Sequence, residues 1–201
     1  MKLKLYISLL LIFASLTSFS QKNSLEIELT EFDSIIHSKI YRIDIGGYQC
    51  LELVEFKNGK LSGSLTNSVY VSNQKGTNKK LISQKINIPQ NMINNLFKIL
   101  TENHFETITD CKDVYGCVIG LDGTTTSFTV LTNNTNRAYS YWEIDSNYYY
   151  KDKEIPQEVF KVRKILKEVN NIVDLKIQFE NFKIRLPKGI YCFNGVIMTK
   201  G

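Results

Sequence analysis

Histidine, proline and tryptophan are scarce in this chain, with two His, three Pro and one Trp among 201 residues. Because only His37 and His104 are available, both a multi-histidine metal centre and a catalytic histidine base have very few residues to use. The scarcity of proline, together with many aromatic and β-branched residues, argues against a disordered chain. No charge of one sign dominates, since the formal net charge is only +5. That balance argues against nucleic acid as a partner.

The chain has few long apolar runs, and the clearest is Leu5–Leu16, which is almost entirely apolar. This run is shorter than the roughly 20 residues that a membrane-spanning helix needs. A basic start precedes it, and Ser18 and Ser20 supply the small residues of a cleavage site, so residues 1–20 are predicted to be a secretory signal peptide and residues 21–201 a single domain. No Cys follows to accept a lipid. We therefore expect a periplasmic or secreted protein that is neither a lipoprotein nor held by a transmembrane anchor.

Four cysteines lie in the predicted mature chain: Cys50, Cys111, Cys117 and Cys192. An even number of cysteines in a chain sent to an oxidising compartment favours disulfides. Cys111 and Cys117 flank a short polar segment, so we expect them to pair, and Cys50 would then pair with Cys192. The alternative is a zinc site built from all four thiolates, although the C-x-x-C spacing typical of such sites is missing.

Alternating apolar residues predict strands, and two Asn-Gly pairs, at 58–59 and 194–195, predict tight hairpin turns. Helical spacing of apolar residues instead begins at Ile88 and again after Pro156. The order predicts an α+β fold with antiparallel sheets built from hairpins and meanders and two amphipathic helices packed on one face. The predicted strands are Leu25–Leu29, Tyr41–Ile45, Cys50–Phe56, Leu61–Val71, Cys117–Leu121, Thr124–Leu131, Arg137–Ile144, Ile190–Phe193 and Val196–Met198, with Asn73–Lys80 as an exposed polar tip.

An aromatic cluster near the end of a predicted strand is the strongest candidate for a binding surface. Alternate residues of a strand face opposite sides, so some of these rings can enter the core while the others stay available. Tyr and Trp offer large, stiff, amphipathic surfaces that suit a protein partner or stacking on sugar rings. The alternative is that the rings only cover the sheet and seat the second helix. The cluster consists of Tyr139, Tyr141, Trp142, Tyr148, Tyr149 and Tyr150.

Several short motifs resemble those of uncharacterised exported proteins of Gram-negative bacteria. They are the signal ending Ser-Phe-Ser-Gln, the run Leu121-Asp122-Gly123, the run Tyr139-Ser140-Tyr141-Trp142, and Leu186-Pro187-Lys188-Gly189-Ile190-Tyr191. Apart from the signal, the resemblance covers the C-terminal half from about Cys111. Such families have no assigned activity, so the resemblance implies export and leaves the function open.

Taken together, these patterns predict a non-catalytic binding domain of the bacterial envelope that needs no metal and no cofactor. Its partner would be an envelope or secreted protein, as for a periplasmic immunity or inhibitor protein, or a saccharide. One alternative is a hydrolase of envelope polymers that uses Asp and Glu side chains for acid–base chemistry. Another is a scaffold subunit of an envelope complex, which would expose an apolar patch or a free sheet edge.

Overall fold

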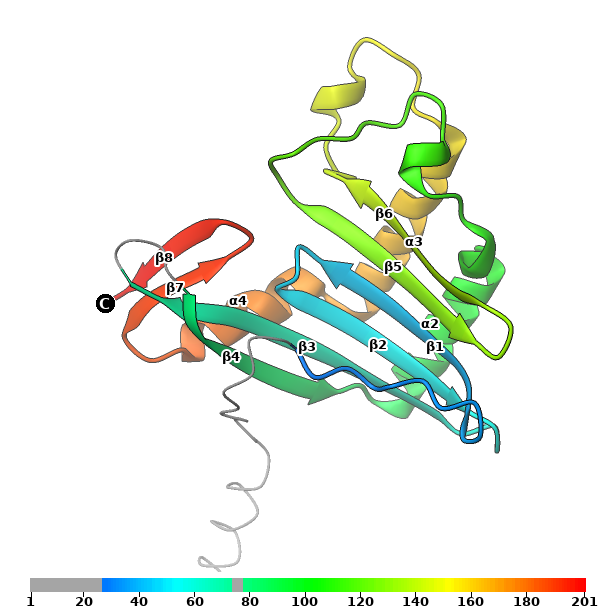
Figure 1. Ribbon diagram of the computed structural model, residues 1–201, viewed down its shortest axis with the longest axis horizontal. Coiled ribbons are helices and arrows are strands. Elements are labelled where there is room, and N and C mark those ends of the chain that lie inside the picture. Colours follow the sequence, from blue (N-terminus) through cyan, green and yellow to red (C-terminus); the bar gives the residue numbers. More distant parts are fainter. Residues whose placement is uncertain (1–26, 74–77) are drawn as a thin grey trace, which may run out of the picture.

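The computed structural model describes residues 27–73 and 78–201, so the predicted signal peptide lies outside the described residues. One antiparallel sheet carries the strands in the order β6-β5-β1-β2-β3-β7-β8, and β4 also pairs with β3 (Figure 1). The strands are β1 (His37–Ile45), β2 (Gln49–Phe56), β3 (Leu61–Ser72), β4 (Asn78–Asn87), β5 (Thr125–Thr132), β6 (Asn136–Trp142), β7 (Gly189–Phe193) and β8 (Val196–Lys200).

The helices are α2 (Gln90–Glu102), α3 (Gln157–Val173) and α4 (Leu175–Arg185), and there are three short 3-10 turns, η1 (Phe105–Thr107), η2 (Cys111–Asp113) and η3 (Tyr148–Tyr150). The predicted α+β class with an antiparallel sheet is confirmed. Both Asn-Gly turns join antiparallel strands, and in each the glycine has a positive φ: +80° at Gly59 and +74° at Gly195. Glycine accepts this backbone conformation without steric cost.

Several predicted elements differ from the structure. There are three α-helices in the described chain where two were predicted, because α4 follows α3 directly at Asp174. β4 occupies the end of the segment predicted as a polar tip, whose centre at 74–77 lies outside the described residues. The predicted strand Cys117–Leu121 is irregular backbone, and so are the described residues of the predicted strand Leu25–Leu29.

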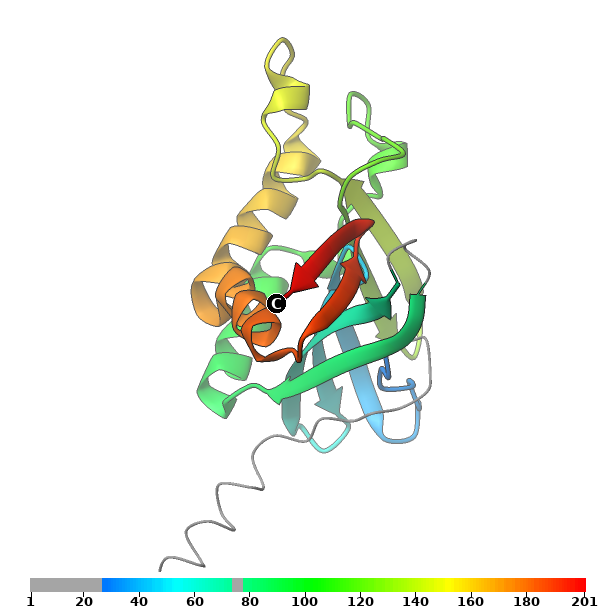
Figure 2. The ribbon, with the colours of Figure 1, turned by 90° about the vertical axis from the view of Figure 1, so that its left-hand side faces the viewer.

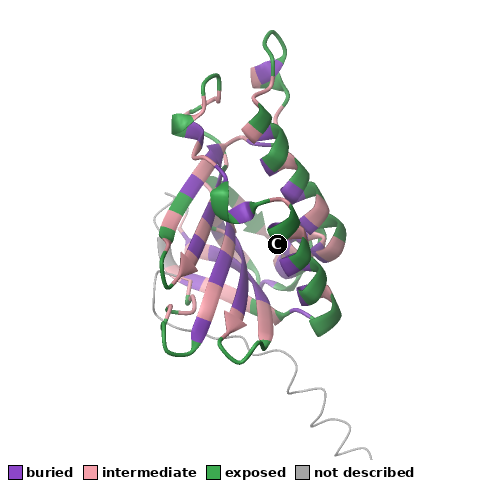
Figure 3. Cartoon of the chain, turned by 90° about the vertical axis from the view of Figure 1, so that its right-hand side faces the viewer, coloured by how far each residue is buried: buried purple, intermediate pink, exposed green. Residues whose placement is uncertain are grey.

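Figure 2 shows α2, α3 and α4 beside the sheet, and in Figure 3 residues of the buried class occur on both the strands and the helices. The larger core cluster joins β1, β2, β5 and β6 to α2 and α3, whereas a smaller one joins β3 and β7 to α4. Between the two clusters, the buried Gln49 amide donates to Asn67 Oδ1 at 2.7 Å and to the Leu175 carbonyl at 2.8 Å. No helix in the described ranges is long and apolar enough to cross a membrane.

A buried ion pair lies on the sheet face opposite the helices. The Glu52 side chain is only 3% exposed and accepts a hydrogen bond from Arg42 Nε at 2.9 Å. Glu52 also accepts from the Thr30 backbone N–H at 3.0 Å and from the Thr30 hydroxyl at 2.6 Å, while the Arg42 guanidinium donates to the Thr30 carbonyl. These bonds hold the irregular segment before β1 against the sheet.

The first predicted disulfide, Cys111 with Cys117, is confirmed, and its two Cα atoms are 5.5 Å apart. It joins η2 to the irregular segment that leads into β5. The bond also removes the four-thiolate zinc alternative, because sulfurs in a disulfide are not thiolates.

The second predicted disulfide, Cys50 with Cys192, is wrong. Both residues are free cysteines in the structure. Cys50 pairs in register with Thr66 of β3, and Cys192 pairs with Tyr70 of the same strand. Four residues of a strand place the two sites roughly 13 Å apart, well beyond the roughly 7 Å between Cα atoms that a disulfide can span.

Candidate functional site

Three of the six aromatic residues predicted to form a binding surface are buried: Tyr139, Tyr141 and Tyr150. The Tyr139 hydroxyl donates to the Phe105 carbonyl at 2.8 Å, and the Tyr141 hydroxyl donates to the Thr109 carbonyl at 2.5 Å. Burial raises the pKa of both hydroxyls, which keeps them protonated as donors. These rings seat the segment after α2 on the sheet, so the prediction that they contact a partner is corrected.

The other three rings form a cluster just beyond the end of β6, with one tilted and one edge-to-face contact. Trp142 lies 4.6 Å from Tyr149 between ring centroids, and Tyr149 lies 5.2 Å from Tyr148. The indole Nε1 of Trp142 donates to the Asp122 carbonyl at 2.6 Å. The indole also covers Gly120 so closely that a Cβ there would lie 2.4 Å from the ring. Trp142 and Tyr149 are therefore only half-exposed, whereas Tyr148 is 68% exposed.

The segment over which Trp142 packs carries exposed apolar side chains that the sequence analysis did not single out. Tyr115 and Leu121 are fully exposed, and Ile119 is 65% exposed. This segment and the η3 turn project from the same end of the molecule, beyond β5 and β6 (Figure 1). Tyr115, Ile119, Leu121 and Tyr148 are called the loop-tip surface below.

Three contacts hold the backbone beneath the loop-tip surface. The disulfide closes the stretch that contains Tyr115. One residue past the disulfide, the Val118 N–H donates to the Tyr150 hydroxyl at 3.2 Å. Trp142 then fixes the position of Asp122. The exposed side chains therefore project from a braced backbone.

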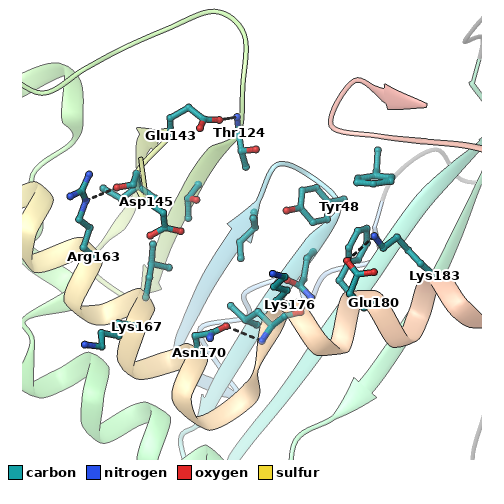
Figure 4. Close-up of a pocket in the computed structure, with 18 residues that line it drawn as sticks. Tyr48, Thr124, Glu143, Asp145, Arg163, Lys167, Asn170, Lys176, Glu180 and Lys183 are labelled. Atoms are coloured by element: carbon teal, nitrogen blue, oxygen red, sulfur yellow. Dashed lines mark hydrogen bonds and ion pairs between the residues drawn. The ribbon is translucent and has the colours of Figure 1, made fainter. Parts of the chain in front are cut away.

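A pocket of about 610 Å³ lies where the turns at one end of the sheet meet the corner between α3 and α4 (Figure 4). Its residues come from the β1–β2 turn, the start of β5, the end of β6, both helices and β7. They are Ile45, Tyr48, Gln49, Thr124, Thr126, Glu143, Ile144, Asp145, Arg163, Leu166, Lys167, Asn170, Leu175, Lys176, Phe179, Glu180, Lys183 and Phe193.

Two hairpin turns, β1–β2 and β7–β8, and the open end of the β5–β6 hairpin form the rim of this pocket. Asn194, in the β7–β8 turn, donates to the Thr124 hydroxyl at 2.8 Å. Glu143, just after β6, accepts from the Thr124 N–H at 2.5 Å and has a φ of +45°. A positive φ is strained for a residue with a long side chain, and such strain is common at functional sites.

The opposite wall is fixed by the corner between the two helices. Asp174 ends α3 and begins α4 with a φ of +45°, and its carboxylate accepts from the Ile177 N–H at 3.1 Å. The Asn170 Oδ1 atom accepts from the Leu175 N–H at 3.1 Å. One residue therefore turns the chain between the helices without a loop.

Aromatic rings make part of the pocket wall. The ring centroid of Phe179 lies 4.6 Å from that of Tyr48 and 5.1 Å from that of Phe193. The Tyr48 hydroxyl points into the pocket (Figure 4). Partial burial raises the pKa of this hydroxyl, with smaller contributions from the charges of Asp44 and Glu143, so it is a hydrogen-bond donor at neutral pH.

Some of the charged side chains that line the pocket already form hydrogen bonds or ion pairs within the protein. Arg163 donates to the Ile144 carbonyl at 2.6 Å and to the Ser146 carbonyl at 2.7 Å, so it fixes the turn after β6. Glu180 and Lys183 form an ion pair at 2.8 Å. Partial burial raises the pKa of Asp145, an effect that the nearby Arg163 charge opposes.

Within residues 27–73 and 78–201, no three His, Cys, Asp or Glu side chains gather in a way that could hold a metal ion. Comparison with protein-family models and with curated proteins finds no match to this chain. The case for each candidate site therefore depends on the geometry of its own residues.

Proposed function

We propose that this protein is an exported binding domain of the bacterial envelope that recognises a protein partner through the loop-tip surface. The observation that carries the proposal is the exposure of Tyr115, Leu121 and Tyr148 together at one braced end of the molecule. Export is expected from the signal peptide predicted over residues 1–20, and the Cys111–Cys117 disulfide is consistent with an oxidising compartment.

Exposing these apolar side chains to water and ordering them on binding both cost free energy. Contiguous exposed apolar side chains are typical of interaction sites. Aromatic and aliphatic anchors contribute most of the affinity of an interface when a partner buries them. Because the disulfide and Trp142 already hold the backbone beneath them, binding would order little besides the side chains. A periplasmic inhibitor or immunity protein is one concrete role of this kind.

The pocket carboxylates favour binding over the alternative of acid–base hydrolysis. Glu143 already accepts a backbone hydrogen bond, and Glu180 is paired with Lys183. A glycosidase-type mechanism needs two carboxyl groups that face the same bond of the substrate. Asp145 is the remaining acid of the pocket, and it lies beside the Arg163 charge.

The test is affinity capture from the native envelope with the tagged mature protein, followed by mass spectrometry. The variant carries Leu121→Ser and Tyr148→Ser, which remove two exposed anchors and leave the disulfide and Trp142 in place. Ile184→Ser is the matched control, since Ile184 is 71% exposed but lies on α4, away from the loop tip. We expect the double variant to lose its main partner by about tenfold or more and the control to retain it.

Circular dichroism and thermal unfolding should show that both variants fold like the parent. Equal recovery of the partner by the parent and the folded double variant would remove the loop-tip surface from this role. Loss of the partner with Ile184→Ser alone would move the interface to α4.

A further inference from the structure

Four donor groups without a partner among the described residues line the pocket between α3, α4 and the hairpin turns. In the described part of the chain, Lys167 and Lys176 have no ion-pair partner, and the Tyr48 hydroxyl and the Asn170 amide nitrogen have no acceptor. All four groups line the same pocket. Such a set matches a ligand rich in oxygen acceptors, including an anionic one.

Most acceptors of the pocket are already engaged. Glu143 accepts from the Thr124 backbone, and Glu180 is paired with Lys183. The third carboxylate of the pocket, Asp145, lies beside the Arg163 charge. The two lysines come from different helices on the two sides of Asp174. Their positive charge is therefore available to a ligand at the helix corner.

The aromatic wall and the volume of the pocket indicate which uncharged part of a ligand it could hold. Tyr48, Phe179 and Phe193 offer aromatic surface beside polar groups, a combination that suits the apolar face of a sugar ring and its hydroxyls. A volume of about 610 Å³ falls within the range of sites that take small ligands. It has room for one or two sugar rings.

From these observations we infer that the pocket binds an acidic saccharide. The sugar ring lies against Tyr48 and Phe193, and its carboxylate is bound by Lys176, while Lys167 adds positive charge to the same pocket. The Tyr48 hydroxyl and the Asn170 amide donate to ring or hydroxyl oxygens. This site is separate from the loop-tip surface and does not depend on a protein partner there.

Titration calorimetry with two matched sugars tests the inference. N-acetylmuramic acid and N-acetylglucosamine differ by the lactyl ether that carries a carboxylate, and glucuronic acid and glucose form a second pair that differs in charge. We expect at least one acidic sugar to bind about tenfold more tightly than its neutral counterpart, which is the contribution of one well-placed charged contact.

Single substitutions then locate the site. Lys176→Gln should weaken binding of the acidic sugar about fivefold or more and leave binding of the neutral sugar unchanged. Tyr48→Ala should weaken both sugars, because it removes aromatic surface. Lys164→Gln is the matched control, since Lys164 lies on α3 outside this pocket, where its side chain is 62% exposed.

Three results would overturn the inference: equal binding of the acidic and neutral sugar of each pair, no binding of any of the four at about 10 mM, or unchanged binding after Lys176→Gln. The Leu121→Ser and Tyr148→Ser variant separates this site from the proposed function. It should bind the acidic sugar like the parent even if it no longer captures a protein.

Discussion

The Glu52 carboxylate lies almost entirely out of water, yet donors surround it. Arg42 and both donors of Thr30 bind it, and Lys85 Nζ lies 3.9 Å away. A buried charge is tolerated when it is paired and fully hydrogen-bonded, but the loss of one partner leaves the other uncompensated. The stability of the outer face therefore depends on the pair more than on either residue.

We expect Glu52→Ala to lower the free energy of unfolding by about 3–5 kcal/mol, because it leaves the Arg42 guanidinium partly buried without its carboxylate. Urea unfolding followed by circular dichroism measures the change. Glu55→Ala is the control: its neighbour Lys39 is 4.0 Å away and its side chain is 31% exposed. That substitution should cost less than about 1 kcal/mol.

Similar losses for the two variants would contradict this account of Glu52. A second variant keeps the test independent of a folding failure. Glu52→Gln preserves the size of the side chain and one acceptor oxygen, whereas the two donors of Thr30 bind different oxygens of Glu52. It should therefore lose less than Glu52→Ala and still show that the charge matters.

At the level of the elements, residues 111–122 before β5 form no strand. The Cys111–Cys117 disulfide and the hydrogen bond from Trp142 to Asp122 hold this segment in place of sheet pairing. Its bridge joins residues that are six apart in sequence. By chain-entropy arguments a loop of this length contributes about 2 kcal/mol.

We expect Cys117→Ser to lower the free energy of unfolding by about 2 kcal/mol and to speed proteolytic cleavage near Tyr115. Cys192→Ser should do neither, because Cys192 forms no bridge. Thiol titration of the unreduced, denatured parent should find two free thiols, from Cys50 and Cys192. The absence of free thiols would show that the second pair is bonded after all.

Local signals explain which elements the sequence could predict. The Asn-Gly pair at 58–59 sets its hairpin through the backbone preferences of two residues, and α3 has one continuous apolar stripe. In α4, by contrast, Phe179 and Phe182 are buried whereas Ile177 and Ile184 are exposed, so no single stripe marks the helix. β4 is rich in polar residues, so no apolar alternation marks it in the sequence. Its backbone pairs with that of β3.

For the candidate sites, too, local patterns could be predicted from the sequence and contacts between distant segments could not. Alternation along β6 correctly placed Tyr139 and Tyr141 on one face and Trp142 on the other, but it could not say which face the helices would cover. The exposed Leu121 was predicted to lie in a strand, although Gly116, Gly120 and Gly123 argue against regular pairing there. The pocket combines residues from six separate segments of the chain, and no spacing of residues in the sequence predicts that these segments lie together.

At the scale of the whole molecule, burial sets the response to alkaline pH. It raises the pKa of the Cys50 thiol from 9.0 to about 12, with smaller contributions from the charges of Asp44 and Glu52. It also raises the pKa of the Tyr139 and Tyr141 hydroxyls above their ordinary value of 10.0. The folded chain thus keeps protons that the unfolded chain releases.

Above about pH 9 the unfolded state binds fewer of these protons than the folded state, so its free energy falls relative to the folded state. We expect the free energy of unfolding to hold its full value below about pH 9 and to decline as pH rises toward 12, by up to about 1.4 kcal/mol per pH unit for each such group. Urea titrations at pH 8, about 9, about 10 and about 11 measure the slope.

Cys50→Ala provides the control, since it removes the group that ionises first in the unfolded chain. Its decline should begin closer to the ordinary tyrosine pKa of 10.0. A stability that stays constant or rises between about pH 9 and 11 would contradict the assignment of these groups as buried and neutral.

The corner at Asp174 has a geometric consequence for the pocket. Because a single residue joins α3 to α4, the angle between the two helices is set by one pair of backbone dihedrals and one capping carboxylate. Lys167 lies on α3 and Lys176 on α4, so the angle at this corner sets how the backbones that carry the two lysines are placed relative to each other. A change at this one position would reset the width of the pocket opening, and with it the size of molecule admitted, while each helix kept its own sequence.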